Sequence, residues 1–176
     1  MSDERVDALR RDFDQAFALP ITRLADVNER FVTLRVSGMR HAVRVRELSG
    51  LSVIRHITTV PRGAPGLLGL VGLRGALVPV YSLAALLNGG APERVARWLL
   101  LHGAGANIIG FAASEFDGYA EIPRATVHRL AASEASRSHV KEVTHAEGHA
   151  LGVIDLAAVA QVVSQSIGSP PVNKER

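Results

Sequence analysis

Four glycines at three-residue intervals, Gly66, Gly69, Gly72 and Gly75, are the first residues in this chain whose spacing could serve chemistry. Glycine-rich loops can cradle phosphates, but this series lacks the Gly-Lys-Ser/Thr end of a P-loop and the spacing of a dinucleotide fingerprint. The residues between the glycines are apolar except for Arg74, and glycine permits close backbone approach and positive φ. The series therefore favours a tightly bent strand or barrel corner, and no cofactor is expected.

Histidines and carboxylates give no clearer sign of catalysis. His145 and His149 are four residues apart, as in a helical zinc pair, but Gly148 and the flanking strand pattern place them on opposite sides of a turn. The chain has no cysteine, and no third ligand is evident, so no metal is expected. Glu115 and Asp117 precede Gly118 and are expected in a turn, where Asp forms local hydrogen bonds. With no Gly-X-Ser-X-Gly elbow and no recognisable Ser-His-Asp set, the sequence predicts a protein that is not an enzyme.

Composition narrows the possible partners. Twenty Lys and Arg oppose 17 Asp and Glu, and aromatic residues make up only 5% of the chain, so the basic surface and stacking platforms of a nucleic-acid binder are not expected. The absence of cysteine fits a reducing cytoplasm. The N-terminus is acidic, unlike a signal peptide, and no apolar stretch approaches the roughly 20 residues of a membrane span. We expect a cytoplasmic protein without direct membrane insertion.

The N-terminal residues 3–18 have the pattern of an amphipathic helix. Val6, Leu9, Phe13 and Phe17 form one apolar stripe, and Pro20 ends the segment. A helix with one stripe must bury it somewhere. We favour packing on its own domain over docking to a partner.

From Phe31 onward the apolar period changes from helical to alternating, which predicts short strands. A helix is expected from Ser82, whose hydroxyl can cap it, to Asn88, and another from Asp155. The expected strands and hairpins are 31–46 around Ser37-Gly38, the glycine-rich strand and 76–80 around Arg74-Gly75, 98–113 around Gly103-Ala104-Gly105, 119–122, and 140–154 around Ala146-Glu147-Gly148.

Many short strands with few helices predict a mostly β protein built from small barrels. The two halves echo each other, since each has a hairpin, a further strand and a strand leading into a closing helix. We therefore expect two intimately packed barrels, about 31–88 and 97–163, with a seam near 89–97 and strands able to exchange between them. Residues 1–30 form an N-terminal extension, and residues 164–176 are expected to be a flexible tail.

Two adjoining motifs resemble the signature of the CheW family, the coupling proteins of bacterial chemosensory arrays. The family has Gly-Val-Ile-Asn-Leu-Arg-Gly followed by Pro-Val-Ile-Asp-Leu, where this chain has Gly69-Leu-Val-Gly-Leu-Arg-Gly75 and then Pro79-Val-Tyr-Ser-Leu83. Three further regions match in the same order, namely 31–45, 108–122 and 143–156. The resemblance covers about residues 31–163, and it implies two five-stranded SH3-like barrels that share a continuous core.

The resemblance also implies a function by contact. CheW proteins bind the SH3-like regulatory domain of the histidine kinase CheA and the helical-hairpin tip of a methyl-accepting chemoreceptor, and they contact other CheW-like proteins in cytoplasmic arrays at the membrane or pole. Arg74 matches the family's motif arginine, which leaves two roles open: a partner contact, or an internal tie between the barrels. We expect partner binding to involve the following residues: Arg74, Val45, Leu48, Leu51, Val71, Gly72 and Gly75.

Three polar positions depart from the family pattern. Gly72 replaces the motif's Asn, Ser82 replaces its Asp, and Gly50 stands where the family has an acid. The apolar scaffold is kept. The alternative function is therefore a divergent CheW homologue that has lost kinase coupling and recruits another motility or polarity protein, and a small-ligand sensor or an enzyme is less favoured.

Overall fold

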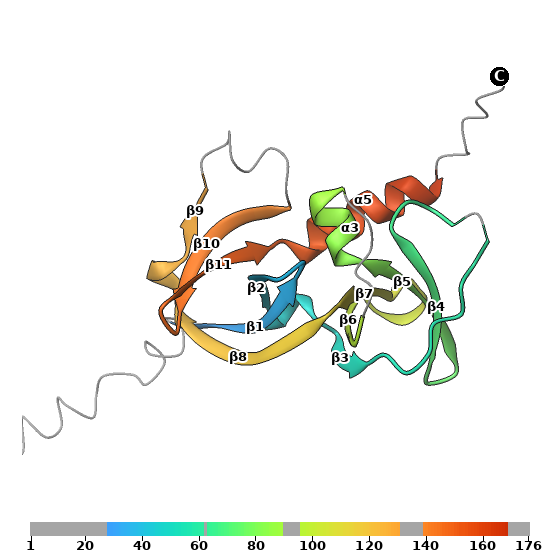
Figure 1. Ribbon diagram of the computed structural model, residues 1–176, viewed down its shortest axis with the longest axis horizontal. Coiled ribbons are helices and arrows are strands. Elements are labelled where there is room, and N and C mark those ends of the chain that lie inside the picture. Colours follow the sequence, from blue (N-terminus) through green and yellow to red (C-terminus); the bar gives the residue numbers. More distant parts are fainter. Residues whose placement is uncertain (1–27, 62, 90–95, 131–138, 169–176) are drawn as a thin grey trace, which may run out of the picture.

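Alternating apolar residues form strands throughout the computed structural model, which describes residues 28–61, 63–89, 96–130 and 139–168 (Figure 1). The predicted amphipathic segment 3–18 lies outside these residues, as does the end of the chain after Gly168. Within the described part, no helix combines the length and apolar character needed to cross a membrane.

The first sheet has six strands in the order β8-β1-β2-β11-β10-β9. Its first hairpin joins β1 and β2 through Ser37 and Gly38, both with positive φ, as predicted. β11 lies parallel to β2, and β8 pairs antiparallel with the other side of β1. The strands are β1 (Asn28–Val36), β2 (Met39–Arg44), β8 (Glu115–Pro123), β9 (His128–Arg129), β10 (Val140–Ala146) and β11 (His149–Ile154).

The second sheet has five strands in the order β3-β6-β7-β5-β4. β5 pairs antiparallel with β4 and parallel with β7, while β3 pairs with β6. An isolated bridge between Thr58 and Leu70 attaches the segment after β3 to β4. The strands are β3 (Gly50–Val53), β4 (Leu67–Leu73), β5 (Ala76–Ser82), β6 (Trp98–His102) and β7 (Ile109–Ala113). The prediction of a mostly β protein with few helices is confirmed, and the two sheets fit the two predicted SH3-like barrels, although one sheet has six strands.

The predicted seam at 89–97 does not coincide with a boundary between the two sheets, and strands are exchanged across it. β5 precedes it and β7 follows it, yet these strands pair side by side in the second sheet. The two sheets do echo each other, because each combines a hairpin, an outer strand and a strand leading into a helix. Hairpin β6–β7, however, completes the sheet of β4 and β5, whereas β1–β2 joins β10 and β11. Hydrogen bonding between distant strands, which local periodicity does not specify, determines this exchange.

Helices α3 (Leu83–Asn88) and α5 (Leu156–Gly168) lie where the sheets meet (Figure 1). The Ser82 hydroxyl caps α3 as predicted, accepting from the Ala85 amide at 3.2 Å. The last helix begins after Asp155 as predicted, and the Asp155 carboxylate accepts from the Ala158 amide at 2.9 Å. We expected a tail from Ser164, but α5 continues to Gly168, and the Ser164 hydroxyl donates to the Ala160 carbonyl.

One apolar cluster joins both sheets and both helices. It contains Val43 of the first sheet, Phe111 of the second, Leu83 of α3 and Leu156 of α5, all essentially inaccessible to solvent. Smaller clusters fill each sheet separately, around Phe31 and Leu151 in the first and around Val80 and Leu99 in the second. The shared cluster makes the sheets one folding unit, since neither could expose this surface to water cheaply.

Candidate partner-binding surfaces

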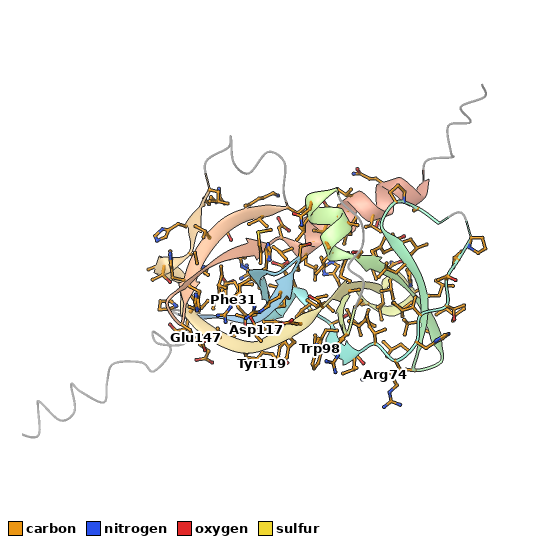
Figure 2. The ribbon with its side chains drawn as sticks, viewed as in Figure 1. Phe31, Arg74, Trp98, Asp117, Tyr119 and Glu147 are labelled. Atoms are coloured by element: carbon orange, nitrogen blue, oxygen red, sulfur yellow. The ribbon has the colours of Figure 1, made fainter. Side chains whose placement is uncertain are left out.

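Arg74 stands at the tip of hairpin β4–β5. It has φ 49° and Gly75 has φ 81°, the pair of left-handed conformations expected of a tight hairpin turn. The side chain is exposed and points away from the body of the protein (Figure 2). No ion pair of Arg74 occurs within the described residues. The geometry does not support an internal tie between the sheets.

An exposed apolar side chain accompanies Arg74. Leu77, at the start of β5, is 74% exposed, more than any other large apolar residue of the described part. It lies directly opposite Gly72 on β4, and a side chain at Gly72 would meet no atom within 4 Å. The hairpin tip therefore presents an exposed leucine beside an open glycine position and an exposed arginine. Sequence reasoning selected Arg74, Gly72 and Gly75 but missed Leu77, because a strand pattern does not show which end of a strand protrudes.

The other predicted site residues do not share one surface. Val45, Leu48 and Leu51 are partly buried against the shared core, whereas Val71 packs into the separate core of the second sheet. None of the four is fully exposed or fully buried. These four residues therefore do not line one common groove.

Leu48 does border a depression beside α5. Two adjoining hollows of about 510 and 360 Å³ share His102 and Gly103. Leu48 and Ser49 line one hollow, and Ala157 and Gln161 of α5 line the other. We call this depression the α5 groove. It lies between the residues that follow β2 and the β6–β7 turn, and α5 forms its other side.

A buried ionic cluster, which sequence reasoning missed, surrounds Arg44 at the end of β2. Its guanidinium is 3.0 Å from Glu29, 3.8 Å from Glu47 and in contact with Glu142, and it lies 5.6 Å from the centre of the Phe31 ring. Burial alone would lower the Arg44 pKa, but hydrogen bonding and charge from Glu142 and Glu29 hold the pKa above its usual value. Four separate elements meet in this cluster, and only the tertiary fold brings them together.

Glu47 connects the cluster to α5. Its carboxylate accepts a hydrogen bond from the Leu156 amide at 2.8 Å, at the helix N-terminus. Burial raises the pKa of Glu47 above its ordinary value, although the Leu156 hydrogen bond opposes that change. This carboxylate thus fixes the 3-10 turn Val45–Glu47 against the helix that covers the shared core.

The Arg44 cluster borders a polar cavity of about 810 Å³. Four carboxylates line this cavity, those of Glu29, Glu47, Glu142 and Asp155. Each of them is paired with Arg44, Arg46 or Lys141. The opposing charges are therefore largely satisfied within the protein, which indicates a structural role for the cluster. Within the described residues, no group of three or more His, Cys, Asp or Glu side chains could hold a metal ion.

The other carboxylates and histidines considered in the sequence lie on strands of the first sheet. Glu115 and Asp117 were expected in a turn, but they belong to strand β8, where both carboxylates lie 3.3 Å from Arg35. His145 and His149 flank the β10–β11 turn as predicted.

Comparison with known proteins gives a family and a fold. A sequence model of the CheW-like domain matches residues 30–164. The crystal structure of the scaffolding protein TtCheW from Thermoanaerobacter tengcongensis superposes with a TM-score of 0.62 at 13% identity, covering 73% of this chain and 85% of that one. No curated protein matches the chain.

Proposed function

Because this chain belongs to the CheW-like domain family, a family of chemotaxis scaffolds, we propose that it couples chemoreceptors to a CheA-type histidine kinase. The exposed tip of hairpin β4–β5 carries the proposal, since the Arg74 side chain projects there and Leu77 is largely exposed. A guanidinium beside an apolar side chain is a favourable centre for a protein interface. The SH3-like domain of the kinase is the partner proposed for this tip.

The α5 groove is the proposed site for the receptor. It is concave, its lining combines α5 with the end of β6 and the residues that follow β2, and apolar Leu48 lines it together with Ala157 and Ala160 of α5. A helical-hairpin tip can place one apolar face into such a groove. Val45 and Leu51 support this region from the shared core rather than touching the partner, and Val71 supports hairpin β4–β5 from inside the second sheet.

Arg74→Ala tests the kinase contact. Titration of the purified kinase regulatory domain with the variant should show binding weaker by about 1 to 3 kcal/mol, because a central interface arginine is lost. The melting temperature should be unchanged, since Arg74 makes no ion pair within the described residues. The matched control is Arg124→Ala, which removes an exposed arginine from the first sheet's side of the molecule.

A second substitution separates the two surfaces. Gln161 is exposed on α5, so Gln161→Arg places a long charged side chain in the groove without touching the core. It should reduce binding of a receptor-tip fragment while leaving kinase affinity intact. If Arg74→Ala leaves the kinase affinity unchanged, the hairpin tip is not the kinase contact.

The alternative, a homologue that recruits another motility or polarity protein, is favoured by the polar positions that differ from the family. Gly72 leaves open space on the hairpin where the family carries a side chain. Failure of the wild-type protein to bind the kinase domain at all, with receptor binding retained or lost, would favour this alternative.

A further inference from the structure

Three aromatic rings form a continuous row on the outside of the molecule, away from the α5 groove. The Trp98 and Phe116 ring centres are 5.0 Å apart, and those of Phe116 and Tyr119 are 5.4 Å apart. Val53 extends the row, because it lies directly opposite Trp98 on the neighbouring strand. Figure 2 shows Trp98 and Tyr119 along the same side of β8. We call these four residues the aromatic patch.

The aromatic patch bridges the two sheets and exposes much of its apolar surface. Tyr119 is 69% exposed and Val53 is 54% exposed, while Trp98 and Phe116 are half-buried. A β-bulge creates the row: Thr33 pairs with Gly118 and Leu34 with Phe116, so Asp117 is an extra residue in β8. Residues three apart in a regular strand face opposite sides, but the inserted residue puts Phe116 and Tyr119 on one side.

A contiguous aromatic surface of this kind is expected to be in contact with another protein segment. Isolated apolar residues on a protein surface are ordinary, but contiguous apolar patches mark contact sites. The aromatic patch shares no residue with the hairpin tip or the α5 groove, which lie elsewhere in the fold. Its occupant is therefore a question separate from kinase or receptor binding.

We propose that the N-terminal segment of this same chain, residues 3–18, covers the aromatic patch with its apolar stripe. The stripe of Val6, Leu9, Phe13 and Phe17 would extend over roughly 16 Å as a helix. The aromatic patch, from Tyr119 to Val53, extends over about 15 Å. This length is the sum of the two distances between ring centres and the distance between neighbouring strands, which separates Trp98 from Val53. The lengths therefore agree.

The position of β1 makes the contact reachable. Asn28, the first residue of β1, lies opposite Pro123 at one end of β8, and Tyr119 lies opposite Val32. The step of four residues along β1, from Asn28 to Val32, is roughly 13 Å long. This is the distance from the start of β1 to the nearest ring of the aromatic patch. Residues 19–27 can span up to about 30 Å when extended. The segment can thus turn back at β1 and lie along β8 without displacing any strand.

Two features of the composition make the proposal directly testable. Trp98 is the only tryptophan, so its fluorescence reports on the aromatic patch alone, and the chain has no cysteine, so engineered cysteine pairs have no competitors. The crosslinking variant combines Phe17→Cys with Tyr119→Cys in the full chain. Its control combines Gln15→Cys with Tyr119→Cys, because Gln15 lies on the opposite face of the predicted helix.

Under mild oxidation, the Phe17→Cys pair should form an intramolecular disulfide, seen as a faster-migrating monomer on a non-reducing gel, and the Gln15→Cys pair should not. A disulfide-linked dimer would show that a second copy covers the aromatic patch, and it would overturn the proposal. Equal crosslinking of both pairs would overturn it as well, since it would indicate random collision.

Fluorescence gives an independent result. Replacing Phe13→Ser and Phe17→Ser together should raise acrylamide quenching of Trp98 by about twofold and shift its emission to the red, because the indole loses an apolar cover. The control, Arg11→Ser with Gln15→Ser, should match the wild type. Unchanged quenching in the Phe13→Ser, Phe17→Ser variant, with no intramolecular disulfide in the first experiment, would mean that the N-terminal segment does not lie on the aromatic patch.

Discussion

Replacing Arg44 by methionine should destabilise the protein strongly, although Arg44 touches no predicted partner surface. Methionine keeps an apolar stem near Phe31 but removes the charge. Glu29 would still have Arg46 at 2.6 Å, and Glu47 would still accept from Leu156, but Glu142 would lose its cation. The Arg44 side chain is 11% exposed, and the carboxylate side chains around it, of Glu29, Glu47 and Glu142, are 12%, 16% and 23% exposed, so these carboxylates are poorly hydrated.

The structure sets the size of this effect. Breaking a fully buried ion pair costs about 3 to 5 kcal/mol. Here one carboxylate keeps another cation and the cluster borders a cavity, so about 2 to 3 kcal/mol is expected for Arg44→Met. Arg44→Lys retains the charge but cannot reach three carboxylates with one planar group, and it should cost about 1 kcal/mol.

Urea denaturation at pH 7, followed by circular dichroism, measures this change. With a slope of about 2 kcal/mol per molar urea, the Arg44→Met midpoint should fall by more than about 1 M. Adding Glu142→Gln to the same chain should recover part of the loss, because the carboxylate without a partner is then neutral. A loss below about 0.5 kcal/mol for Arg44→Met would show that these pairs behave as solvent-screened surface contacts, which would refute the argument.

Two further predictions concern the fold. Gly69→Ala should cost about 2 to 4 kcal/mol of folding free energy, measured by urea denaturation. The added Cβ would come within 2.2 Å of the Thr58 carbonyl oxygen, and the φ of Gly69 is 146°. The control Gly72→Ala adds a Cβ in open space, and its folding free energy should stay within about 0.5 kcal/mol of the wild type. Burial lowers the His41 pKa below 6.5, so the unfolded chain binds the proton more tightly and stability should fall as the pH drops below about 6.5. The variant His41→Asn should show a shallower decline over this range; an identical pH dependence would exclude His41 as a contributor.

The local elements could be predicted from the sequence because their signals are local. Alternating apolar residues marked the strands, and the Ser82 and Asp155 side chains marked the two helix starts through bonds to amides three residues on. The Arg74-Gly75 turn followed from the need for positive φ in a tight hairpin. Arg74, Gly72 and Gly75 were expected to act together because they stand in the motif that resembles the CheW signature.

Only the tertiary structure decided which strands share a sheet and which side chains meet. β5 and β7 pair across the predicted seam, and four elements bring their charges to Arg44, through contacts between residues far apart in the chain. Likewise, the bulge at Asp117 aligns Phe116 with Tyr119, and β3–β6 pairing places Val53 opposite Trp98. Apolar periodicity specifies which face of a strand is buried, but it does not specify the neighbour against which that face packs.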